Sequence, residues 1–209
     1  MKILVTGGAG FIGSHLVDKL IELGHSVLVL DNLSNGKKEN INSKAEFHQV
    51  DICDFKTMNL YFKDIDYVFH LAALPRVVIS IEDPIGTSSV NIMGTINVFE
   101  ASKQNNIKRV ISTSSSSVYG NQDKLPLKED MIPKPINPYG LQKWVGERFA
   151  KLYTEVYGLP VVSIRPFNVY GPKIDAGSDY SLAIGRFLKQ KSLGRPLPIN
   201  GDGEQTRGY

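Results

Sequence analysis

The chain has 209 residues, a formal net charge of +3, 42% hydrophobic residues and 22% charged residues. This composition is typical of a folded protein and argues against extensive disorder. The basic residues form no long run, so nucleic-acid binding has no electrostatic footprint here. The single cysteine, Cys53, excludes an internal disulfide, and no apolar run reaches the length of a membrane helix. We therefore expect a cytoplasmic protein with no metal site and with neither nucleic acid nor membrane as a partner.

Strand-like and helix-like segments alternate along the first 165 residues. Apolar runs predict strands at 3–5, 26–30, 47–50, 67–71, 109–112 and 161–164, and helical spacing predicts helices at 11–23, 91–104 and 139–157. Such alternation is typical of a doubly wound α/β sheet with parallel strands. Glycine and proline crowd the sequence after residue 165, where only 180–190 has helical spacing. We expect one α/β domain over 1–165 and a smaller, loop-rich lobe over 166–209.

A glycine-rich turn joins the first strand to the first helix. Residues 8–13 satisfy G-x-G-x-x-G, and Gly7, Gly10 and Gly13 form an overlapping set. Such glycines permit a tight turn, close approach of a pyrophosphate and tight packing of the helix on the strand. Asp31 ends the second strand, where a carboxylate accepts ribose hydroxyls and repels a 2′-phosphate. The pattern predicts a Rossmann-type site for NAD rather than NADP; the alternative is a ligand-free turn.

Three polar residues form a candidate proton-transfer group. Tyr139 and Lys143 are four apart on a predicted helix and therefore share a face. An adjacent ammonium, together with a positively charged nicotinamide, favours a tyrosine phenolate and lowers its pKa. Ser115 follows the strand at 109–112, at the edge where ligands gather in such sheets. The assignment among adjacent serines is uncertain by one residue, and an exposed Tyr–Lys pair is the alternative for the helix.

Ordered matches run along nearly the whole chain and resemble the extended short-chain dehydrogenase/reductases of the NAD-dependent epimerase/dehydratase family. They include Thr6–His15, Asp31–Leu33, His70–Ala73, Tyr139 with Lys143, and Arg165–Pro172. The resemblance implies a catalytic trio of Ser115, Tyr139 and Lys143. It also implies NAD contacts from Gly7, Gly10, Phe11, Ile12, Gly13, Asp31, Asn32, Asp51, Ile52, Leu71, Ala72, Ala73, Arg76, Asn91, Ser114, Tyr139, Lys143 and Pro166.

The resemblance also assigns roles within this set. Asp51 and Ile52 are expected to hold the adenine, and the run 71–73 to line the cofactor after the fourth strand. Arg76 is expected near the cofactor phosphates, and Asn91 to hold that region in place. For apolar residues at a strand end, a plain core role is the alternative.

Two serines separate the possible reactions. Related dehydratases carry an Asp-Glu pair directly after the catalytic Ser/Thr, where this chain has Ser116 and Ser117. Without those carboxyls, the resemblance implies epimerisation at C4 of a UDP-hexose, through a 4-keto intermediate. UDP-glucose, UDP-galactose and their N-acetyl forms remain open as substrates. Another sugar-nucleotide reaction, dehydration or reduction, is an alternative, and so is an inactive NAD-binding protein.

The resemblance extends to the second lobe and to assembly. Substrate contacts are expected from Ser115, Ser116, Asn168 and Arg207, the last as a bidentate partner of the diphosphate. Family members continue beyond the point matching Tyr209, so we expect the lobe over 166–209 to be incomplete. A homodimer is expected through the helices near 91–104 and 140–156. One departure stands beside the Lys: Gln142 occupies a position where the family often has Ser.

Overall fold

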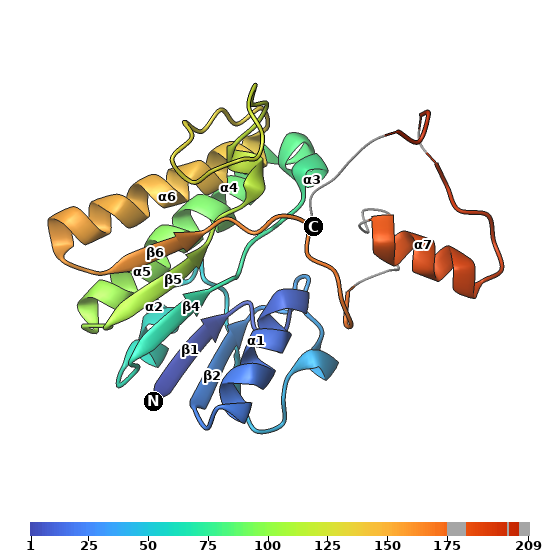
Figure 1. The fold of residues 1–209 in the computed structure, drawn as a ribbon. Coiled ribbons are helices and arrows are strands. Elements are labelled where there is room, and N and C mark those ends of the chain that lie inside the picture. The colour runs from blue at the N-terminus through green and yellow to red at the C-terminus, as the bar shows by residue number, and fades with distance from the viewer. Residues whose placement is uncertain (175–182, 200, 205–209) are drawn as a thin grey trace. The chain divides into compact units, whose positions relative to one another are not determined.

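A six-stranded parallel sheet forms the centre of the first 165 residues (Figure 1). The structure is a computed structural model that describes residues 1–174, 183–199 and 201–204. Its chain divides into two compact units, Met1–Arg165 and Pro166–Tyr209. The strands are β1 (Lys2–Thr6), β2 (Ser26–Asp31), β3 (Glu46–Gln49), β4 (Tyr67–His70), β5 (Arg109–Thr113) and β6 (Val161–Ile164). All six expected strands are present, with ends shifted by a residue or so.

The strand order is β3-β2-β1-β4-β5-β6, and every neighbouring pair is parallel. The order reverses direction between β1 and β4, the place where ligands bind in doubly wound sheets. Because the strands are parallel, their carboxyl ends lie along one edge. Gly7, Asp31, Leu71 and Ser114 each follow or end a strand at that edge. The predicted doubly wound Rossmann sheet is confirmed.

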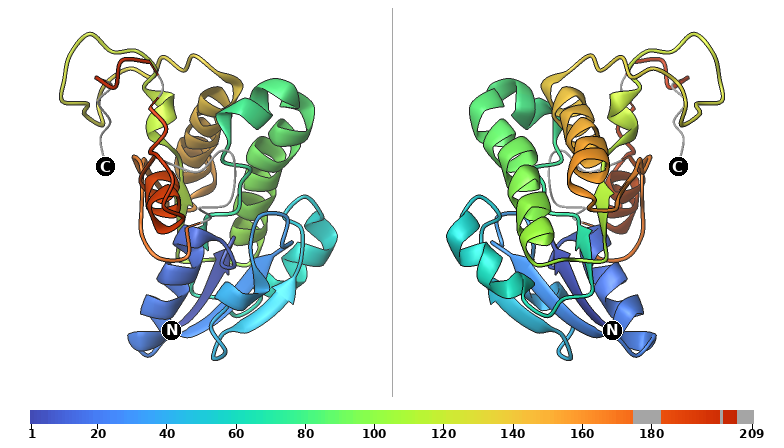
Figure 2. Two further views of the ribbon diagram at one scale, coloured as in Figure 1. Left: turned by 90° about the vertical axis from the view of Figure 1, so that its right-hand side faces the viewer. Right: turned by 90° about the vertical axis from the view of Figure 1, so that its left-hand side faces the viewer.

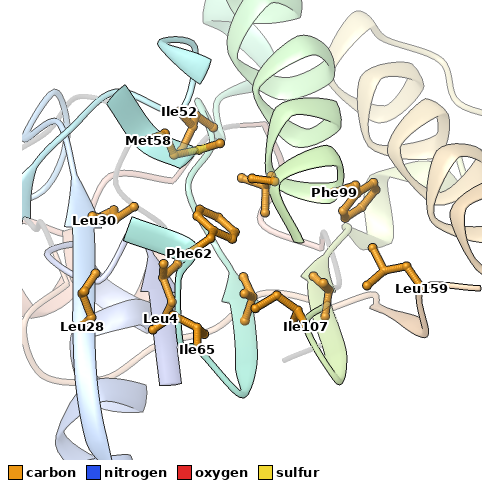
Figure 3. Packing of buried hydrophobic residues seen from close by; sticks show 14 of the residues in the cluster. Leu4, Leu28, Leu30, Ile52, Met58, Phe62, Ile65, Phe99, Ile107 and Leu159 are labelled. Atoms are coloured by element: carbon orange, nitrogen blue, oxygen red, sulfur yellow. The ribbon is translucent and has the colours of Figure 1, made fainter. Parts of the chain in front are cut away.

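Two apolar clusters, one on each face of the sheet, hold the helices in place. Leu4, Leu28 and Val68 belong to the cluster that also contains residues of α2 (Phe55–Asn59), α5 (Thr95–Gln104) and α6 (Pro138–Tyr157). Figure 3 shows this packing at close range, with Phe62 beside Leu4 and Phe99 on the helical side. The alternate strand residues, such as Ile3 and Val5, pack against α1 (Phe11–Glu22). Figure 2 shows α1 and α2 on opposite sides of the sheet.

The buried face of α1 begins with small side chains. Its buried residues are Gly13, Ser14, Val17 and Leu20, whereas the exposed fraction of Ile12 is 40%. The small side chains at the start of α1 let the helix approach the strands closely, which turns Ile12 toward solvent.

The helix expected near 91–104 is the last part of a longer, irregular segment. Helices α3 (Val77–Glu82) and α4 (Pro84–Ser88) precede a π-helix, η3 (Ser89–Gly94), which leads directly into α5. Short helical turns η1 (Lys38–Asn40), η2 (Leu60–Phe62) and η4 (Ser116–Val118) were also not predicted. These elements are too short for apolar periodicity to reveal them.

In the second unit the structure describes one helix, α7 (Ala183–Ser192), close to the range expected. Within the described residues of the chain, no helix is both long enough and apolar enough to cross a membrane.

Candidate active site

The turn after β1 leaves the start of α1 open to an anion. Gly7 has a φ of +74°, and its N–H donates to Leu30 O at 2.8 Å, which ties the turn to β2. Gly10 is the N-cap of α1, with no side-chain cap and no acidic residue in the first turn. The first N–H groups of a helix have no intrahelical acceptor, and the helix dipole adds positive potential there. This turn therefore suits a phosphate group.

The three spaced glycines have different physical reasons. A Cβ on Gly7 would lie 2.6 Å from Ala72 N, and one on Gly13 would overlap Gly7 O. Both positions therefore need glycine for packing. A Cβ on Gly10 would meet only Gly7 O, at 3.3 Å, and its φ and ψ of −77° and 176° suit any residue. Neither packing nor backbone conformation therefore requires glycine at position 10.

Two carboxylates stand at the ends of β2 and β3, each held by backbone N–H groups. Asp31 accepts from Ala9 N at 3.0 Å and from Leu33 N at 2.8 Å. Asp51 accepts from Cys53 N at 2.8 Å and from the amide of Asn32 at 2.9 Å. Burial works against ionisation of Asp51, but these hydrogen bonds outweigh it and lower its pKa.

The side chain of Ile52 points away from this edge. It is 4% exposed and lies in the apolar core, close to Met58 in Figure 3. Ile52 can therefore offer a ligand at this edge little beyond its backbone.

The loop after β4 rests against the phosphate turn. Leu71 N donates to Thr6 O at 3.0 Å, and Ala72 N donates to the Thr6 hydroxyl at 3.3 Å. Leu71, Ala72 and Ala73 are half-buried, and Arg76 is the N-cap of α3. Farther along the loop, Leu74 is held by Asn91 through a pair of hydrogen bonds, described below.

Asn91 lies in the π-helix and is only 1% exposed. Its Oδ1 accepts from Leu74 N at 2.8 Å, and its Nδ2 donates to Leu74 O at 3.1 Å. The same Nδ2 donates to Gln142 Oε1 at 2.8 Å. These contacts show how Asn91 can act on a cofactor pocket without touching the cofactor, because it fixes the backbone of the loop.

Tyr139 and Lys143 share the inward face of α6, with exposed fractions of 8% and 7%. The Lys143 ammonium lies 6.0 Å from the centre of the Tyr139 ring and donates to Thr113 O at 2.9 Å. Ser115 hydrogen-bonds the Tyr139 phenol, and its oxygen accepts from Ser117 N at 3.1 Å. The serine hydrogen is therefore available to the phenol oxygen.

The pKa of Tyr139 is set mainly by its burial. Burial raises the pKa, and the hydrogen bond from Ser115 offsets only part of that effect. Burial also lowers the pKa of Lys143 to about 8. The chain's own groups thus leave Tyr139 protonated near neutral pH, and a lowering by Lys143 together with a positively charged nicotinamide stays a prediction.

The structure separates the adjacent serines. Ser114 is buried, and its hydroxyl donates to Glu147 Oε1 at 2.5 Å. Glu147 also forms a two-point ion pair with Arg165, at 2.8 and 2.7 Å. Among the interactions described for Tyr139, Ser115 is the one of these adjacent serines that contacts the phenol, which favours the register proposed for it. Ser116 is half-buried in η4.

The remaining candidates lie beyond residue 165. Pro166 and Asn168 are half-buried residues of the second unit. Arg207 lies outside the described residues. Within the described parts of the chain, no group of three or more His, Cys, Asp or Glu residues is placed to hold a metal ion.

Comparison with known proteins agrees with this geometry. The profile described as "NAD dependent epimerase/dehydratase family" matches residues 3–209. The chain belongs to this family. A putative UDP-glucose 4-epimerase of Methanocaldococcus jannaschii is 46% identical over 99% of the chain and 68% of its own length.

Solved structures of the family have the same fold. A UDP-glucose 4-epimerase of Thermotoga maritima with UDP-glucose matches with a TM-score of 0.97 and 42% identity, over 100% of this chain and 69% of its own. A UDP-N-acetylglucosamine 4-epimerase of Methanobrevibacter ruminantium matches with a TM-score of 0.95 and 44% identity, over 99% and 67%. This chain thus spans about two thirds of the length of each.

The residues of the epimerase fold fit NAD, the cofactor of this family. The space above Gly10, the uncapped start of α1 and the anchored Asp31 lie along one edge of the sheet, as a dinucleotide requires.

Sequence analysis gave no role to two residues that shape this edge, His70 and Glu147. His70 is fully buried between the hydroxyls of Thr6, at 2.8 Å, and Thr95, at 3.0 Å. Burial, aided by the charge of Lys143, lowers its pKa to about 3, so it is neutral. Glu147 was also missed, although it lies one helical turn after Lys143. A polar residue on the inward face of a predicted helix is the signal that could have revealed it.

Proposed function

We propose that this protein is an NAD-dependent epimerase acting at C4 of a UDP-hexose through a 4-keto intermediate. The observation that carries the proposal is the Ser115–Tyr139 contact beside buried Lys143, at the carboxyl edge of a dinucleotide-binding sheet. Ser116 and Ser117 follow, so neither position after the catalytic Ser provides a carboxyl to remove water from the sugar. Similarity to enzymes named as UDP-sugar 4-epimerases supports the same reaction.

Each residue of the trio has a distinct role in the proposed reaction. When bound, NAD⁺ supplies a reversible acceptor for the hydride on C4. Tyr139 takes the proton of the sugar 4-hydroxyl and later returns it, as a general base and then a general acid. Ser115 donates to the phenol oxygen and stabilises its ionised form. Lys143, fixed by Thr113 O, orients the nicotinamide ribose.

The cofactor contacts follow from the strand ends. Gly10, Phe11, Ile12 and the glycines at 7 and 13 present the start of α1 to the pyrophosphate. Asp31, with Asn32, accepts the adenosine ribose hydroxyls. Asp51 and the backbone of Ile52 hold the adenine, and the run 71–73 lines the nicotinamide half, with Arg76 near the phosphates. We assign Asn91 an indirect role through Leu74. Ser114 is engaged by Glu147, so we give it a supporting role as well.

For the substrate, we propose that Ser115 and Ser116 contact the sugar and that Asn168 and Arg207 bind the diphosphate. The relatives named above act on UDP-glucose or UDP-N-acetylglucosamine, so both hexose classes remain candidates. Parallel assays with UDP-galactose and UDP-N-acetylgalactosamine decide between them.

Replacing the phenol tests the reaction. We expect Tyr139→Phe to lower turnover by about 10²–10⁴-fold, as loss of an acid–base group does, while the protein still binds NAD. Tyr157→Phe is the matched control, because Tyr157 lies on the same helix, is 50% exposed and keeps its ring in the variant. Turnover of Tyr139→Phe within a factor of three of the control contradicts the mechanism. A dehydrated sugar as the product contradicts the reaction class.

We also propose a homodimer through the α4–α6 region. Large apolar side chains are exposed there: Ile81 at 60%, Ile85 at 84%, Met93 at 53% and Leu141 at 47%. They come from α3, α4, η3 and α6, which pack on one another. Sedimentation of the protein and of Met93→Glu tests this, with a dimer expected only for the unmodified chain. A monomer in both cases rules the dimer out.

A further inference from the structure

Gln142 lies on the catalytic face of α6, three residues after Tyr139 and directly before Lys143. It is 2% exposed, and hydrogen bonds to other elements engage both ends of its amide. Oε1 accepts from Asn91 Nδ2 at 2.8 Å, and Nε2 donates to the Thr87 hydroxyl at 2.9 Å. A buried amide needs such partners. The proposed chemistry does not use the Gln142 side chain, so its contacts call for another explanation.

Two backbone groups fix the direction of this hydrogen-bond chain. The N–H of Leu74 can only donate, so Asn91 must turn Oδ1 toward it and Nδ2 toward Gln142. At the other end, the Thr87 hydroxyl donates to Asp83 O at 2.7 Å. Thr87 is then left to accept from Gln142 Nε2. The amide of Gln142 therefore has a single orientation, set from both sides.

The far end of the chain is the loop 71–76. This loop has no regular secondary structure before α3. One end is tied to the phosphate turn through Thr6, which accepts from Leu71 N and Ala72 N. The other end is tied through Leu74 to Asn91, and through Asn91 to Gln142. The route from the phosphate turn to the catalytic helix thus passes through three buried polar side chains and one short loop.

We propose that Gln142 is a positioning residue that sets the loop 71–76 in register with Tyr139 and Lys143. The inference rests on the proposed function, because it takes the loop to be one wall of the NAD site. An apolar side chain at position 142 removes one of the two acceptors of Asn91 Nδ2 and leaves only Leu74 O. One buried N–H of Asn91 then has no partner, and the loop is less firmly held. The expected consequences are a lower affinity for NAD and a less favourable position of the Tyr139 phenol relative to the sugar.

The central experiment compares three single variants with the unmodified protein. Gln142→Met keeps the length of the side chain and removes its amide. Asn91→Ala breaks the link to the loop directly. Thr87→Val is the matched control: it removes a buried hydroxyl on the far side of Gln142. Gln142 Nε2 keeps a second acceptor, the Ser88 hydroxyl at 3.1 Å, and the residues that link Gln142 to Leu74 are unchanged. NAD affinity is measured by calorimetry after removal of bound cofactor, and amide hydrogen exchange is followed in 71–76.

We expect Gln142→Met to weaken NAD binding about tenfold, equivalent to about 1.4 kcal/mol, and to speed exchange in 71–76. Asn91→Ala should do the same, and the double variant should add little, because both act through one chain. In turnover, kcat should fall more than the KM for the UDP-sugar rises. Thr87→Val should have a lower free energy of unfolding, but its NAD affinity, its kcat and its KM for the UDP-sugar should stay close to those of the unmodified protein.

Different results separate the two proposals. An unchanged NAD affinity with unchanged exchange in Gln142→Met overturns the positioning role while leaving the proposed function intact. An equal loss of affinity in Thr87→Val also overturns it, since the effect is then one of general stability. If Gln142→Met does not fold, the NAD affinity and the exchange rates of Asn91→Ala are compared with those of Thr87→Val, and the same outcomes decide. An unmodified protein that binds no NAD contradicts the proposed function itself.

Discussion

The contrast between Gly10 and Gly13 gives the sharpest test of the cofactor site. An added Cβ at Gly10 meets only Gly7 O, at 3.3 Å, and the backbone there suits alanine. Alanine stabilises the folded protein by about 0.4–1 kcal/mol because it restricts the unfolded chain. The loss of glycine, a good N-cap residue, acts in the opposite direction. We therefore expect Gly10→Ala to change the free energy of unfolding by no more than about 0.5 kcal/mol.

The effect of Gly10→Ala on NAD should be much larger. The new methyl group occupies the space through which the pyrophosphate reaches the backbone. Overpacking of this kind costs about 1–3 kcal/mol, so the Kd for NAD should rise by about 5- to 150-fold. Calorimetric titration with NAD measures this directly, and denaturant unfolding without NAD measures stability.

Gly13→Ala is the matched variant, because its Cβ overlaps the backbone oxygen of Gly7. The overlap costs about 2–3 kcal/mol at the upper end of the overpacking range, and the gain in helix propensity returns about 1 kcal/mol. A net loss of about 1–2 kcal/mol in unfolding free energy is expected, with no NAD present. If Gly10→Ala binds NAD like the unmodified protein, or loses as much stability as Gly13→Ala, the reasoning is refuted.

Three further predictions concern charge. The pKa of Lys143 is lowered by burial from 10.5 to about 8, so between these pH values the unfolded chain binds a proton that the folded chain does not. The free energy of unfolding, compared with that of Lys143→Met, should therefore rise with pH across that window by up to about 3 kcal/mol. If chemical denaturation shows a difference between the two proteins that does not change with pH, the prediction is wrong. Asp31→Asn should weaken NAD binding about tenfold and narrow the preference for NAD over NADP; an unchanged ratio of the two Kd values argues against contact with the ribose. The pKa of Tyr139, followed by ultraviolet absorbance against Tyr139→Phe, should fall when NAD⁺ is added, and a pKa that stays above its ordinary value removes Tyr139 as the base.

The parts of this fold that sequence analysis predicted are those with short-range signals. The strands β1, β2 and β4 are apolar runs that stop at polar or glycine residues, and the phosphate turn carries its spacing within six positions. Tyr139 and Lys143 are one helical turn apart, so their shared face follows from helix geometry alone. Predictions that depend on a period or on a local turn need no knowledge of distant residues.

The parts that escaped prediction depend on contacts distant in sequence. Gln142 was noted only as a departure from a common Ser, because its partner Asn91 is 51 residues away. The close packing of Gly13 against the phosphate turn also depends on contacts that apolar spacing does not encode. The π-helix at Ser89–Gly94 has no periodicity of its own. Its register places Asn91 against Leu74 and Gln142, which no local pattern encodes.

The raised pKa of Tyr139 has a consequence for how the proposed chemistry is controlled. Burial favours the protonated phenol, and the only offsetting contact among those described is the hydroxyl of Ser115. Lys143 is held by Thr113 O, with its ammonium 6.0 Å from the centre of the ring. A bound NAD⁺ would supply additional positive charge that favours the phenolate, and NADH would not. The same buried phenol is thus favoured as a base before hydride transfer and as an acid after it, because burial makes its pKa sensitive to a single nearby charge.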